Sequence, residues 1–259
     1  MNNHLPTRIV IFAKAPQPGL AKTRLVPKLG AEGAAALARH MLADTLQRAL
    51  ATPADAVELC MSPAPDDAAW QDITIPQGVI RTFQGGGDLG ERMGRAVQRL
   101  TNQDLLQDSV PQPVHDALLP AGQPPAHVPQ AAILIGTDCP ALTPQHMAEA
   151  MAQLQTYDAV MLPASDGGYV LLGLKAPCPG IFTHMPWSTS TVGAETLQRL
   201  AALQLRCWTG SVLHDIDEPD DLAHLPASFL HQLSAPSPAL FSPLSPSSPS
   251  PQSHNAICR

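Results

Sequence analysis

Charged side chains are scarce in this sequence. Only 14% of its 259 residues are Asp, Glu, Lys or Arg, and the formal net charge is −7 at pH 7. Broad binding to nucleic acid requires an extended basic surface, which this composition does not supply. A few cations gathered in one loop would still bind a phosphate group. The composition therefore argues against a nucleic-acid-binding protein and leaves nucleotide binding open.

Paired cysteines and long hydrophobic runs are also missing. The five cysteines are scattered, with no Cys-x-x-Cys pair and no histidine at zinc-finger spacing. Neither a disulfide framework nor a structural zinc site is expected from such spacing. The apolar run at 9–12 is too short for a signal or membrane helix, and no later run is long enough to span a bilayer. We therefore expect a cytoplasmic protein with no membrane partner.

Apolar runs typical of buried strands alternate along the chain with segments of helical spacing, of which 31–50 is the clearest. Hydrophobic residues make up 44% of the sequence, enough for a substantial core. The alternation predicts an α/β fold that is Rossmann-like, with a mostly parallel sheet sandwiched by helices. The predicted strands are 9–12, 57–61, 79–83, 131–136, 159–162, 169–174 and 205–208.

Two segments depart from this pattern and hold most of the surplus among the 28 prolines. Residues 101–130 are rich in Gln, Pro and Asp and lack periodicity, which predicts a flexible insertion. Residues 234–259 are almost only Ser, Pro and small residues, which predicts a disordered tail. We therefore expect a single domain over 1–233.

A basic loop follows the first predicted strand, with Gly-Leu-Ala-Lys-Thr-Arg at 19–24. Gly19 lets backbone N–H groups approach an anion, Lys22 supplies a point charge, and Arg24 supplies a bidentate fork. Together with Thr23, these residues suit a di- or triphosphate, although the Walker motif is absent. The alternative interpretation is an exposed basic turn before a helix.

Two further segments bring carboxylates to the ends of predicted strands. Gly-Thr-Asp-Cys-Pro at 136–140 places Asp138 where it could hold Mg²⁺ or Mn²⁺ bridging phosphates, or act as a helix cap or Asx turn. In His-Asp-Ile-Asp at 214–217, alternation puts Asp215 and Asp217 on one face and directs Ile216 toward the core. A carboxylate from this face that meets Asp138 would complete an oxygen-rich magnesium site.

The segment Ser-Asp-Gly-Gly-Tyr at 165–169 separates two predicted strands. One interpretation is a plain hairpin turn. The other is that Asp166 points into the site and engages the acceptor as a base, while the backbone of Gly167 and Gly168 passes close to the acceptor or sugar. Trp187 downstream either forms the rim of the site or packs in the core.

Residues 85–93 form a second glycine-rich loop, in which Asp88 is expected to cap the following helix. Arg92 either faces the phosphates or pairs with Asp88 one turn back, and a structural role is favoured for both. The ten histidines show no ligand spacing and are interpreted as surface or packing residues.

Together these motifs resemble the bacterial DUF2064 family, the selenodomain-associated transferases of the nucleotide-diphospho-sugar transferase superfamily. The resemblance covers about residues 7–233 without the insertion. It implies a GT-A fold and, from the usual label of the family, a glycosyltransferase. The motifs that carry it are Phe-Ala-Lys-Ala-Pro-x-Pro-Gly-x-x-Lys-Thr-Arg-Leu at 12–25, Gly-Thr-Asp-Cys-Pro at 136–140, Asp-Gly-Gly-Tyr at 166–169 and Asp-Ile-Asp-Glu-Pro-Asp-Asp-Leu at 215–222.

Two of the same segments are also similar to nucleotidyltransferases of this superfamily, notably phospholactate and molybdenum-cofactor guanylyltransferases. That similarity implies that Lys22 and Arg24 hold phosphates and that Asp138 and Asp217 hold the metal. One departure is the loop Ala-Lys-Ala-Pro, which here stands in place of the Leu-Ala-Gly-Gly of many nucleotidyltransferases.

The sequence thus predicts a transferase that depends on Mg²⁺ or Mn²⁺ and uses an activated nucleotide, with Asp138, Asp166 and Lys22 as catalytic residues. The first hypothesis is glycosyl transfer from a nucleotide-sugar to a small-molecule acceptor. The second is nucleotidyl transfer from a nucleoside triphosphate to a phosphorylated small molecule, which the Lys22 and Arg24 pair favours. The third is a nucleotide sensor without turnover. No oligomeric state is predicted.

Overall fold

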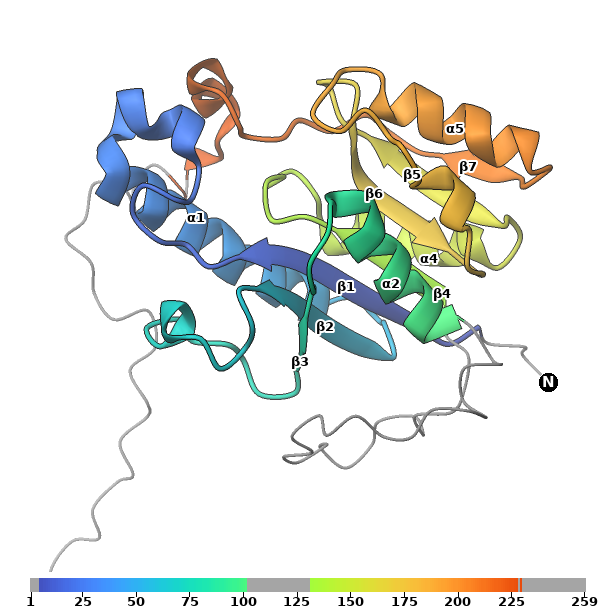
Figure 1. Ribbon diagram of the computed structural model, residues 1–259, viewed down its shortest axis with the longest axis horizontal. Coiled ribbons are helices and arrows are strands. Elements are labelled where there is room, and N and C mark those ends of the chain that lie inside the picture. The colour runs from blue at the N-terminus through green and yellow to red at the C-terminus, as the bar shows by residue number, and fades with distance from the viewer. Residues whose placement is uncertain (1–4, 102–130, 228, 230–259) are drawn as a thin grey trace, which may run out of the picture.

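The computed structural model describes residues 5–101, 131–227 and 229. Within them, seven strands form one sheet in the order β3-β2-β1-β4-β6-β5-β7 (Figure 1). β6 runs antiparallel to β4 and β5, and the other neighbouring pairs are parallel. The mostly parallel sheet that the sequence predicts is confirmed. The strands are β1 (Thr7–Lys14), β2 (Ala56–Ser62), β3 (Ile80–Phe83), β4 (Ala131–Ile135), β5 (Ala159–Pro163), β6 (Tyr169–Leu174) and β7 (Cys207–Thr209).

Helices cover both faces of the sheet, as predicted. On one face, α1 (Val26–Leu50) and α4 (Pro144–Leu154) contribute to a core cluster with the inward side chains of the strands. On the other, α2 (Leu89–Thr101) and α5 (Val192–Ala202) contribute to a second cluster. The central strands are therefore buried on both sides, which explains their continuous apolar runs.

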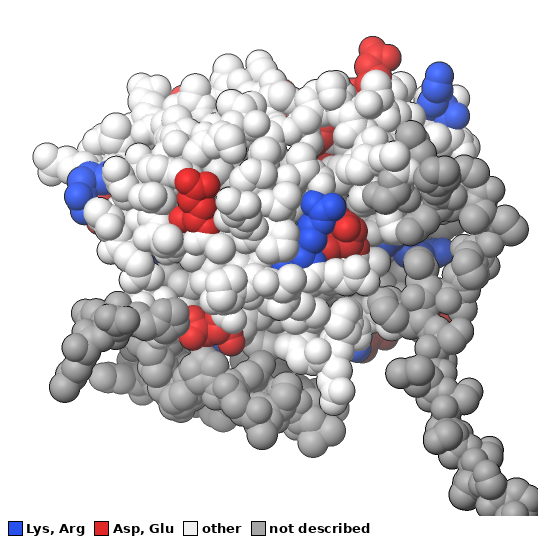
Figure 2. Space-filling view, turned by 180° about the vertical axis from the view of Figure 1, so that it is seen from behind, with Lys and Arg blue, Asp and Glu red and all other residues white. Residues whose placement is uncertain are grey.

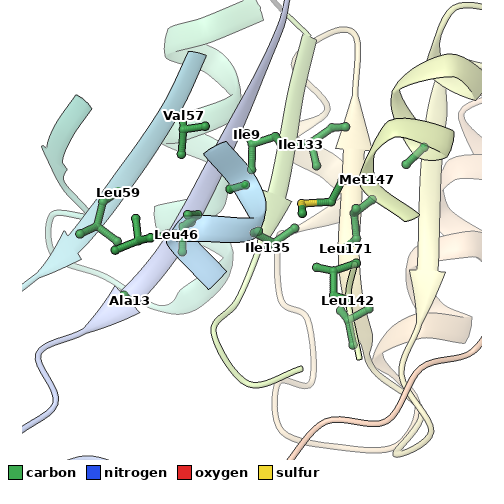
Figure 3. Packing of buried hydrophobic residues seen from close by; sticks show 14 of the residues in the cluster. Ile9, Ala13, Leu46, Val57, Leu59, Ile133, Ile135, Leu142, Met147 and Leu171 are labelled. Carbon is green, nitrogen blue, oxygen red and sulfur yellow. The ribbon is translucent and has the colours of Figure 1, made fainter. Parts of the chain in front are cut away.

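Strand β1 shows how the two cores share one run of sequence. Ile9 and Ile11 belong to the cluster under α1 and α4, and Val10 between them belongs to the cluster under α2 and α5. All three side chains are fully buried. Figure 3 shows the first cluster, in which Ile9 and Ile133 from adjacent strands lie near Leu46 of α1 and Met147 of α4. Alternate residues of a strand thus hold helices on opposite faces.

Helix α1 contains a break at Gly30, which the sequence analysis does not predict, since its helix begins only at residue 31. Gly30 has φ 71° and ψ 167°, which are not helical values, so the chain changes direction there. The regular helix begins after it, where the predicted helix over 31–50 begins. Glycine occupies this left-handed region without the steric cost that a side chain would add.

Both proline-rich segments fall on residues that the structure does not describe. Thr101, the first residue of the predicted insertion, is still the last residue of α2. The rest of the insertion and the tail at 234–259 lie outside the described residues. Over the part that is described, no helix is long and apolar enough to cross a membrane. Figure 2 shows one face on which charged side chains are few and scattered, with no continuous basic surface.

A buried ion cluster holds the middle of β2. Glu58 is fully buried, and its carboxylate accepts hydrogen bonds from Arg8 at 3.1 Å, from Thr82 at 2.6 Å and from Arg99. Burial alone would raise the pKa of Glu58, but Arg99, Thr82 and Arg8 together lower it below its ordinary value. Glu58 is therefore ionised at neutral pH and ties β1, β3 and α2 to β2.

Replacing Glu58 with Gln should lower the free energy of unfolding by about 3 kcal/mol at pH 7, because the change leaves buried cations without a counter-charge. The pKa of Glu58 is lowered on folding from 4.5. Its contribution is therefore fully present above about pH 4.5 and is lost as the pH falls through the folded-state pKa. Urea unfolding across pH 3–7 measures this, with the exposed Glu149→Gln as control. Equal stability of wild type and Glu58→Gln at pH 7 would contradict it.

Candidate functional site

The segments that the sequence singles out leave the sheet at one edge. β1, β4, β5 and β7 run in the same direction, so the residues that follow them meet at their carboxyl ends. Open α/β sheets bind their ligands at this edge. The segments that follow β1, β4 and β7 and the turn between β5 and β6 therefore lie at the same edge of the sheet (Figure 1).

Lys22 joins three of these segments. Its Nζ lies 2.5 Å from Asp138 Oδ1 and 2.8 Å from Asp217 Oδ1, and it donates to the Ile216 carbonyl at 2.5 Å. The Lys22 side chain is only 7% exposed, whereas Asp138 and Asp217 are 44% and 42% exposed. The carboxylates thus face solvent on one side and a buried ammonium on the other. Asp138 and Asp217 thus contact the same ammonium, and their binding of a metal stays a prediction.

Backbone geometry fixes Lys22 in this position. Lys22 adopts the left-handed conformation, with φ 48° and ψ 45°, just before the short 3-10 helix at Thr23–Leu25. Side chains other than glycine occupy this region at a cost of about 1–2 kcal/mol, so its contacts must offset that cost. Ile216 is fully buried in a cluster with Leu25, and its N–H donates to the Asp138 carbonyl at 2.8 Å. The predicted inward orientation of Ile216 is confirmed.

The charge on Lys22 is held firmly. Burial lowers the pKa of Lys22, but the charges of Asp138 and Asp217 and their hydrogen bonds raise it by more, so the pKa ends above its ordinary value. An ammonium group has three N–H donors, and the two carboxylates and the Ile216 carbonyl account for them. In this structure Lys22 neutralises carboxylates, and phosphate binding by Lys22 stays a prediction.

The rest of the basic loop is open to solvent. Arg24 is 58% exposed and pairs with Glu218 at 3.2 Å, a contact that is weak between exposed groups. Gly19 has φ 73°, so the turn before Lys22 uses the conformational freedom of glycine. Thr23 is exposed beside Arg24. The exposed basic turn is therefore what the structure describes, and the loop keeps one cation available to a ligand.

A second pair of carboxylates lies beside the first. Burial raises the pKa of Asp215 to about 6, and the charge of Asp166 is the next largest cause, followed by smaller contributions from Asp217 and Asp138. Asp166 Oδ1 accepts a hydrogen bond from the Gly168 N–H at 2.7 Å, which closes an Asx turn. Four carboxylates from three segments thus make this edge strongly acidic.

Asp138 and Asp217 both contact one cation, and from this geometry we can judge whether a metal ion fits the site. The ammonium of Lys22 stands between Asp138 and Asp217, so their oxygens already share a positive charge. Mg²⁺ is commonly held by one or two carboxylates together with phosphate oxygens and water. Within the described residues, no three His, Cys, Asp or Glu side chains are grouped to hold a metal. Asp138 and Asp217 fit such a shared site, and metal binding by Asp215 stays a prediction.

The turn between β5 and β6 is a hairpin, as one of the two interpretations expected. Gly167 has φ 91°, and a Cβ at this position would lie 2.0 Å from the Ser190 carbonyl oxygen. The Gly167 carbonyl accepts from the Gly193 N–H at 2.8 Å in the first turn of α5. Gly167 is therefore required by packing against α5, whereas Gly168 lines the neighbouring cavity.

A chain of hydrogen bonds links this turn to the segment after β7. Ser165 Oγ lies 2.8 Å from His214 Nδ1, and His214 Nε2 lies 3.0 Å from Asp221 Oδ1. Burial raises the pKa of Asp221, but hydrogen bonds from the N–H groups of Glu218 and Asp217 and from His214 lower it below its ordinary value. Because this carboxylate only accepts, Nε2 carries a hydrogen, and in the neutral imidazole Nδ1 then accepts from the Ser165 hydroxyl.

His214 packs against His224, with ring centroids 3.8 Å apart, which agrees with the packing role that the sequence predicts for the histidines. Its hydrogen bonds were not predicted, and the sequence gives no signal for them because Ser165 lies 49 residues away. The chain of Ser165, His214 and Asp221 holds the β5–β6 turn against the short 3-10 helix at Pro219–His224.

A cavity of about 240 Å³ opens beside the carboxylates, between β4, β6 and the first turns of α2 and α5. Asp138 and Asp166 form its acidic side. Trp187 lines the cavity and also packs against the cluster under α2, so both interpretations of this residue hold. The lining residues are Phe12, Leu89, Met93, Leu134, Ile135, Gly136, Asp138, Asp166, Gly168, Tyr169, Val170, Trp187, Ser188, Thr189 and Val192.

The glycine-rich loop before α2 has the structural role that the sequence analysis favours. Asp88 caps α2, since its Oδ1 accepts from the Glu91 N–H at 2.9 Å. The Arg92 side chain donates to Gln84 Oε1 at 3.3 Å and to the Gly87 carbonyl at 2.9 Å, which is a structural role, although its partner is not Asp88 as one of the two alternatives proposed. Backbone and amide oxygens accept the hydrogen bonds of the Arg92 guanidinium. The Asp88 carboxylate instead caps the N-terminus of α2.

A model of the family described as "Uncharacterized protein conserved in bacteria (DUF2064)" matches residues 45–189. A crystal structure of a proposed nucleotide-diphospho-sugar transferase from Desulfovibrio desulfuricans G20 has 30% sequence identity and a TM-score of 0.67, over 83% of this chain and 84% of that chain. A CMP:2-keto-3-deoxy-manno-octonic acid synthetase complexed with CTP has 12% identity and a TM-score of 0.50, over 88% and 99%, and is similar in fold alone. No curated protein matches the sequence.

Replacing Lys22 with Met should lower the free energy of unfolding by about 1–2 kcal/mol, because two half-exposed carboxylates lose their shared counter-charge. Mg²⁺ should then stabilise the variant more than the wild type, since no ammonium competes for the same oxygens. Urea unfolding with and without Mg²⁺ measures both effects. Lys28→Met, on an exposed lysine nearby, is the control. A metal response equal to that of the wild type would contradict the shared site.

Replacing Gly167 with Ala should destabilise the fold by about 2 kcal/mol or more, because the new Cβ meets the Ser190 carbonyl and the backbone is left-handed. Gly180→Ala is the matched control, since a Cβ there meets nothing within 4 Å. Thermal unfolding of both variants measures the difference. Equal melting temperatures would show that the turn relaxes away from α5.

Proposed function

Since the chain belongs to the DUF2064 family, we propose that it is a metal-dependent transferase that takes an activated nucleotide as donor. The observation that carries this proposal is the convergence of Asp138 and Asp217 on one cation at the carboxyl edge of the sheet. Two carboxylates on a shared positive charge match the ligands of a divalent ion that also binds phosphates. The exposed Arg24 supplies a further contact for such phosphates.

Asp138 and Asp217 would hold Mg²⁺ or Mn²⁺, which when bound supplies positive charge to a departing phosphate group. With a metal held there, Lys22 would no longer lie between the carboxylates and could donate to phosphate oxygens. The loop of Lys22 is anchored at Leu25, which is fully buried, so the side chain can reorient while its backbone stays in place. This assigns Lys22 the phosphate-binding role that the sequence predicts, in the donor-bound state.

The reaction that we propose is glycosyl transfer from a nucleotide-sugar. An acceptor hydroxyl forms a bond to the anomeric carbon, the bond from that carbon to the diphosphate breaks, and the hydroxyl proton passes to Asp166. Asp166 is exposed at the cavity and is oriented by the Gly168 N–H. Nucleoside diphosphate leaves as the second product. The similarity to the transferase from Desulfovibrio desulfuricans G20 supports this choice.

A second candidate is nucleotidyl transfer, in which a phosphorylated small molecule attacks the α-phosphate of a nucleoside triphosphate and pyrophosphate leaves. The presence of two cations, Lys22 and Arg24, in one loop favours it, because a triphosphate carries more negative charge than a nucleotide-sugar. The third candidate, a nucleotide sensor without turnover, would bind a metal through the same two carboxylates and gives Asp166 no catalytic role.

Product analysis separates the three candidates. With a panel of nucleotide-sugars and nucleoside triphosphates and Mg²⁺ or Mn²⁺, we expect free nucleoside diphosphate and no pyrophosphate. Asp138→Asn should lower the rate about 100-fold or more, which corresponds to about 3 kcal/mol of lost transition-state stabilisation. The exposed Asp66→Asn is the matched control and should leave the rate unchanged.

Each alternative outcome has its own meaning. Pyrophosphate release would establish the second candidate, and metal-dependent binding of a nucleotide without any product would establish the sensor. Full activity of Asp138→Asn would overturn the assignment of the metal to Asp138.

A further inference from the structure

The segment that carries Asp217 is closed on itself by one side chain, that of Asp221. The Oδ2 atom of Asp221 accepts hydrogen bonds from the Asp217 N–H at 2.9 Å and from the Glu218 N–H at 2.6 Å. The other oxygen, Oδ1, lies 3.0 Å from His214 Nε2. The Asp221 side chain is 22% exposed. One partly buried carboxylate thus contacts both ends of the motif at 214–217.

A helix cap accounts for only one of these contacts. Glu218 is the N-cap of the short 3-10 helix at Pro219–His224, and Asp221 is the third residue of that helix. A carboxylate in this position commonly accepts from the N-cap N–H, as in a capping box. Asp217 and His214 both precede the cap, so capping requires neither of their contacts with Asp221. These two contacts tie the helix to the motif before it.

The peptide group between Ile216 and Asp217 is held from two sides. Its carbonyl accepts from the Lys22 ammonium at 2.5 Å, and its N–H donates to Asp221 at 2.9 Å. Because a peptide group is planar, the bond to Asp221 also fixes the direction in which the carbonyl points. The Asp217 Cα is bonded to the nitrogen of this group. The orientation of the Asp217 side chain toward Lys22 and Asp138 therefore depends on Asp221.

This contact matters more in the state that the proposed function requires. With a metal held by Asp138 and Asp217, Lys22 would turn to phosphate oxygens and leave the Ile216 carbonyl. Of the described side chains that contact this peptide group, Asp221 would then be the one that remains. Replacing a group that supports a metal ligand from behind typically weakens metal binding about 10–100-fold.

We propose that Asp221 is a positioning residue, which orients Asp217 toward Asp138 through the peptide group that precedes Asp217. This role needs no metal. Its consequence for metal affinity rests on the proposed function and deepens it. Asp220, the neighbouring acid in the same 3-10 helix, is exposed and has no hydrogen bond or ion pair among the described residues, so the role belongs to Asp221 alone.

The first test measures the contact between Asp217 and Lys22 without any metal. A double-mutant cycle of Lys22→Met and Asp217→Ala, by urea unfolding of the full chain, gives the coupling free energy of the pair. The cycle is repeated in the Asp221→Ala background. We expect the coupling there to fall to less than about half of its value in the wild-type background. Equal coupling in the two backgrounds, or no coupling in either, would overturn the proposal.

Two controls separate positioning from a general loss of stability or charge. Asp67→Ala removes a carboxylate that caps another short 3-10 helix, Ala68–Trp70, by accepting from the Ala69 N–H at 2.8 Å. It should lower the free energy of unfolding and leave the coupling unchanged. Asp220→Ala removes the neighbouring charge and should also leave the coupling unchanged. A fall in either control as large as that in Asp221→Ala would contradict the proposal.

Asp221→Asn tests whether the hydrogen bonds or the charge of this residue are responsible. Its amide oxygen can accept from the N–H groups of Asp217 and Glu218, and its amide N–H can donate to His214 Nε2 when the imidazole adopts its other tautomer. This conservative variant should therefore retain most of the coupling between Lys22 and Asp217. A loss as complete as that in Asp221→Ala would assign the effect to charge and overturn the proposal.

The second test measures Mn²⁺ affinity by EPR of the free ion. The parent is Lys22→Met, in which no ammonium competes for the carboxylate oxygens. Adding Asp221→Ala should weaken Mn²⁺ binding about tenfold or more, whereas adding Asp220→Ala should change it less than about twofold. Equal effects of the two additions would overturn the role of Asp221 at the metal site.

The two tests separate this inference from the proposed function. Reduced coupling in Asp221→Ala, with no Mn²⁺ binding to the Lys22→Met parent, would support the positioning of Asp217 and overturn the metal-dependent function. Tight Mn²⁺ binding that Asp221→Ala leaves unchanged would support the metal site and overturn the role of Asp221.

Discussion

The shared ion pair of Lys22 with Asp138 and Asp217 is the constraint on which the rest of the site depends. It joins residues that lie 116 and 195 positions apart, after different strands. The ammonium is buried and the carboxylates are half exposed, so the pair presents its negative side to solvent. The two carboxylates thus form an acidic surface whose charge is neutralised by the buried ammonium beneath it. A ligand that brings its own cation can use that surface, whereas an isolated anion cannot.

The sheet supplies the framework for this arrangement. Parallel strands carry their following loops to one edge, and the single antiparallel strand β6 adds a hairpin at that edge. The hairpin brings Asp166 and Gly168 next to Asp138, and its Gly167 is held against the start of α5. The cavity therefore lies between elements of the sheet and helices on one face. Its shape depends on helix packing, and its charge depends on loops.

Because the sequence has few charged side chains, the networks that these side chains form are important to the structure. The polar chain from Ser165 through His214 to Asp221 and the buried cluster around Glu58 each join segments that are distant in sequence, although Arg8 Nε in the second has no partner among the described residues. One holds the turn beside the site, and the other holds β2 to its neighbours. Polar groups that are satisfied in this way add rigidity, because each partner has only one favourable arrangement. The acidic edge thus rests on a scaffold that does not shift easily.

Local pattern by itself determined the strands, the main helices and the edge of the sheet at which the loops of Asp138 and Asp217 lie. These follow from periodicity and from the direction of parallel strands, which a sequence contains. Only the tertiary structure decided that Lys22 faces the carboxylates and that His214 bridges Ser165 and Asp221. It also decided that the Arg92 side chain bonds to other partners than the Asp88 carboxylate, and that no basic residue is among the described residues that line the cavity. Each of these depends on contacts between residues distant in sequence. A side chain's partner is set by which loops the fold places together, and spacing along the chain does not contain that information.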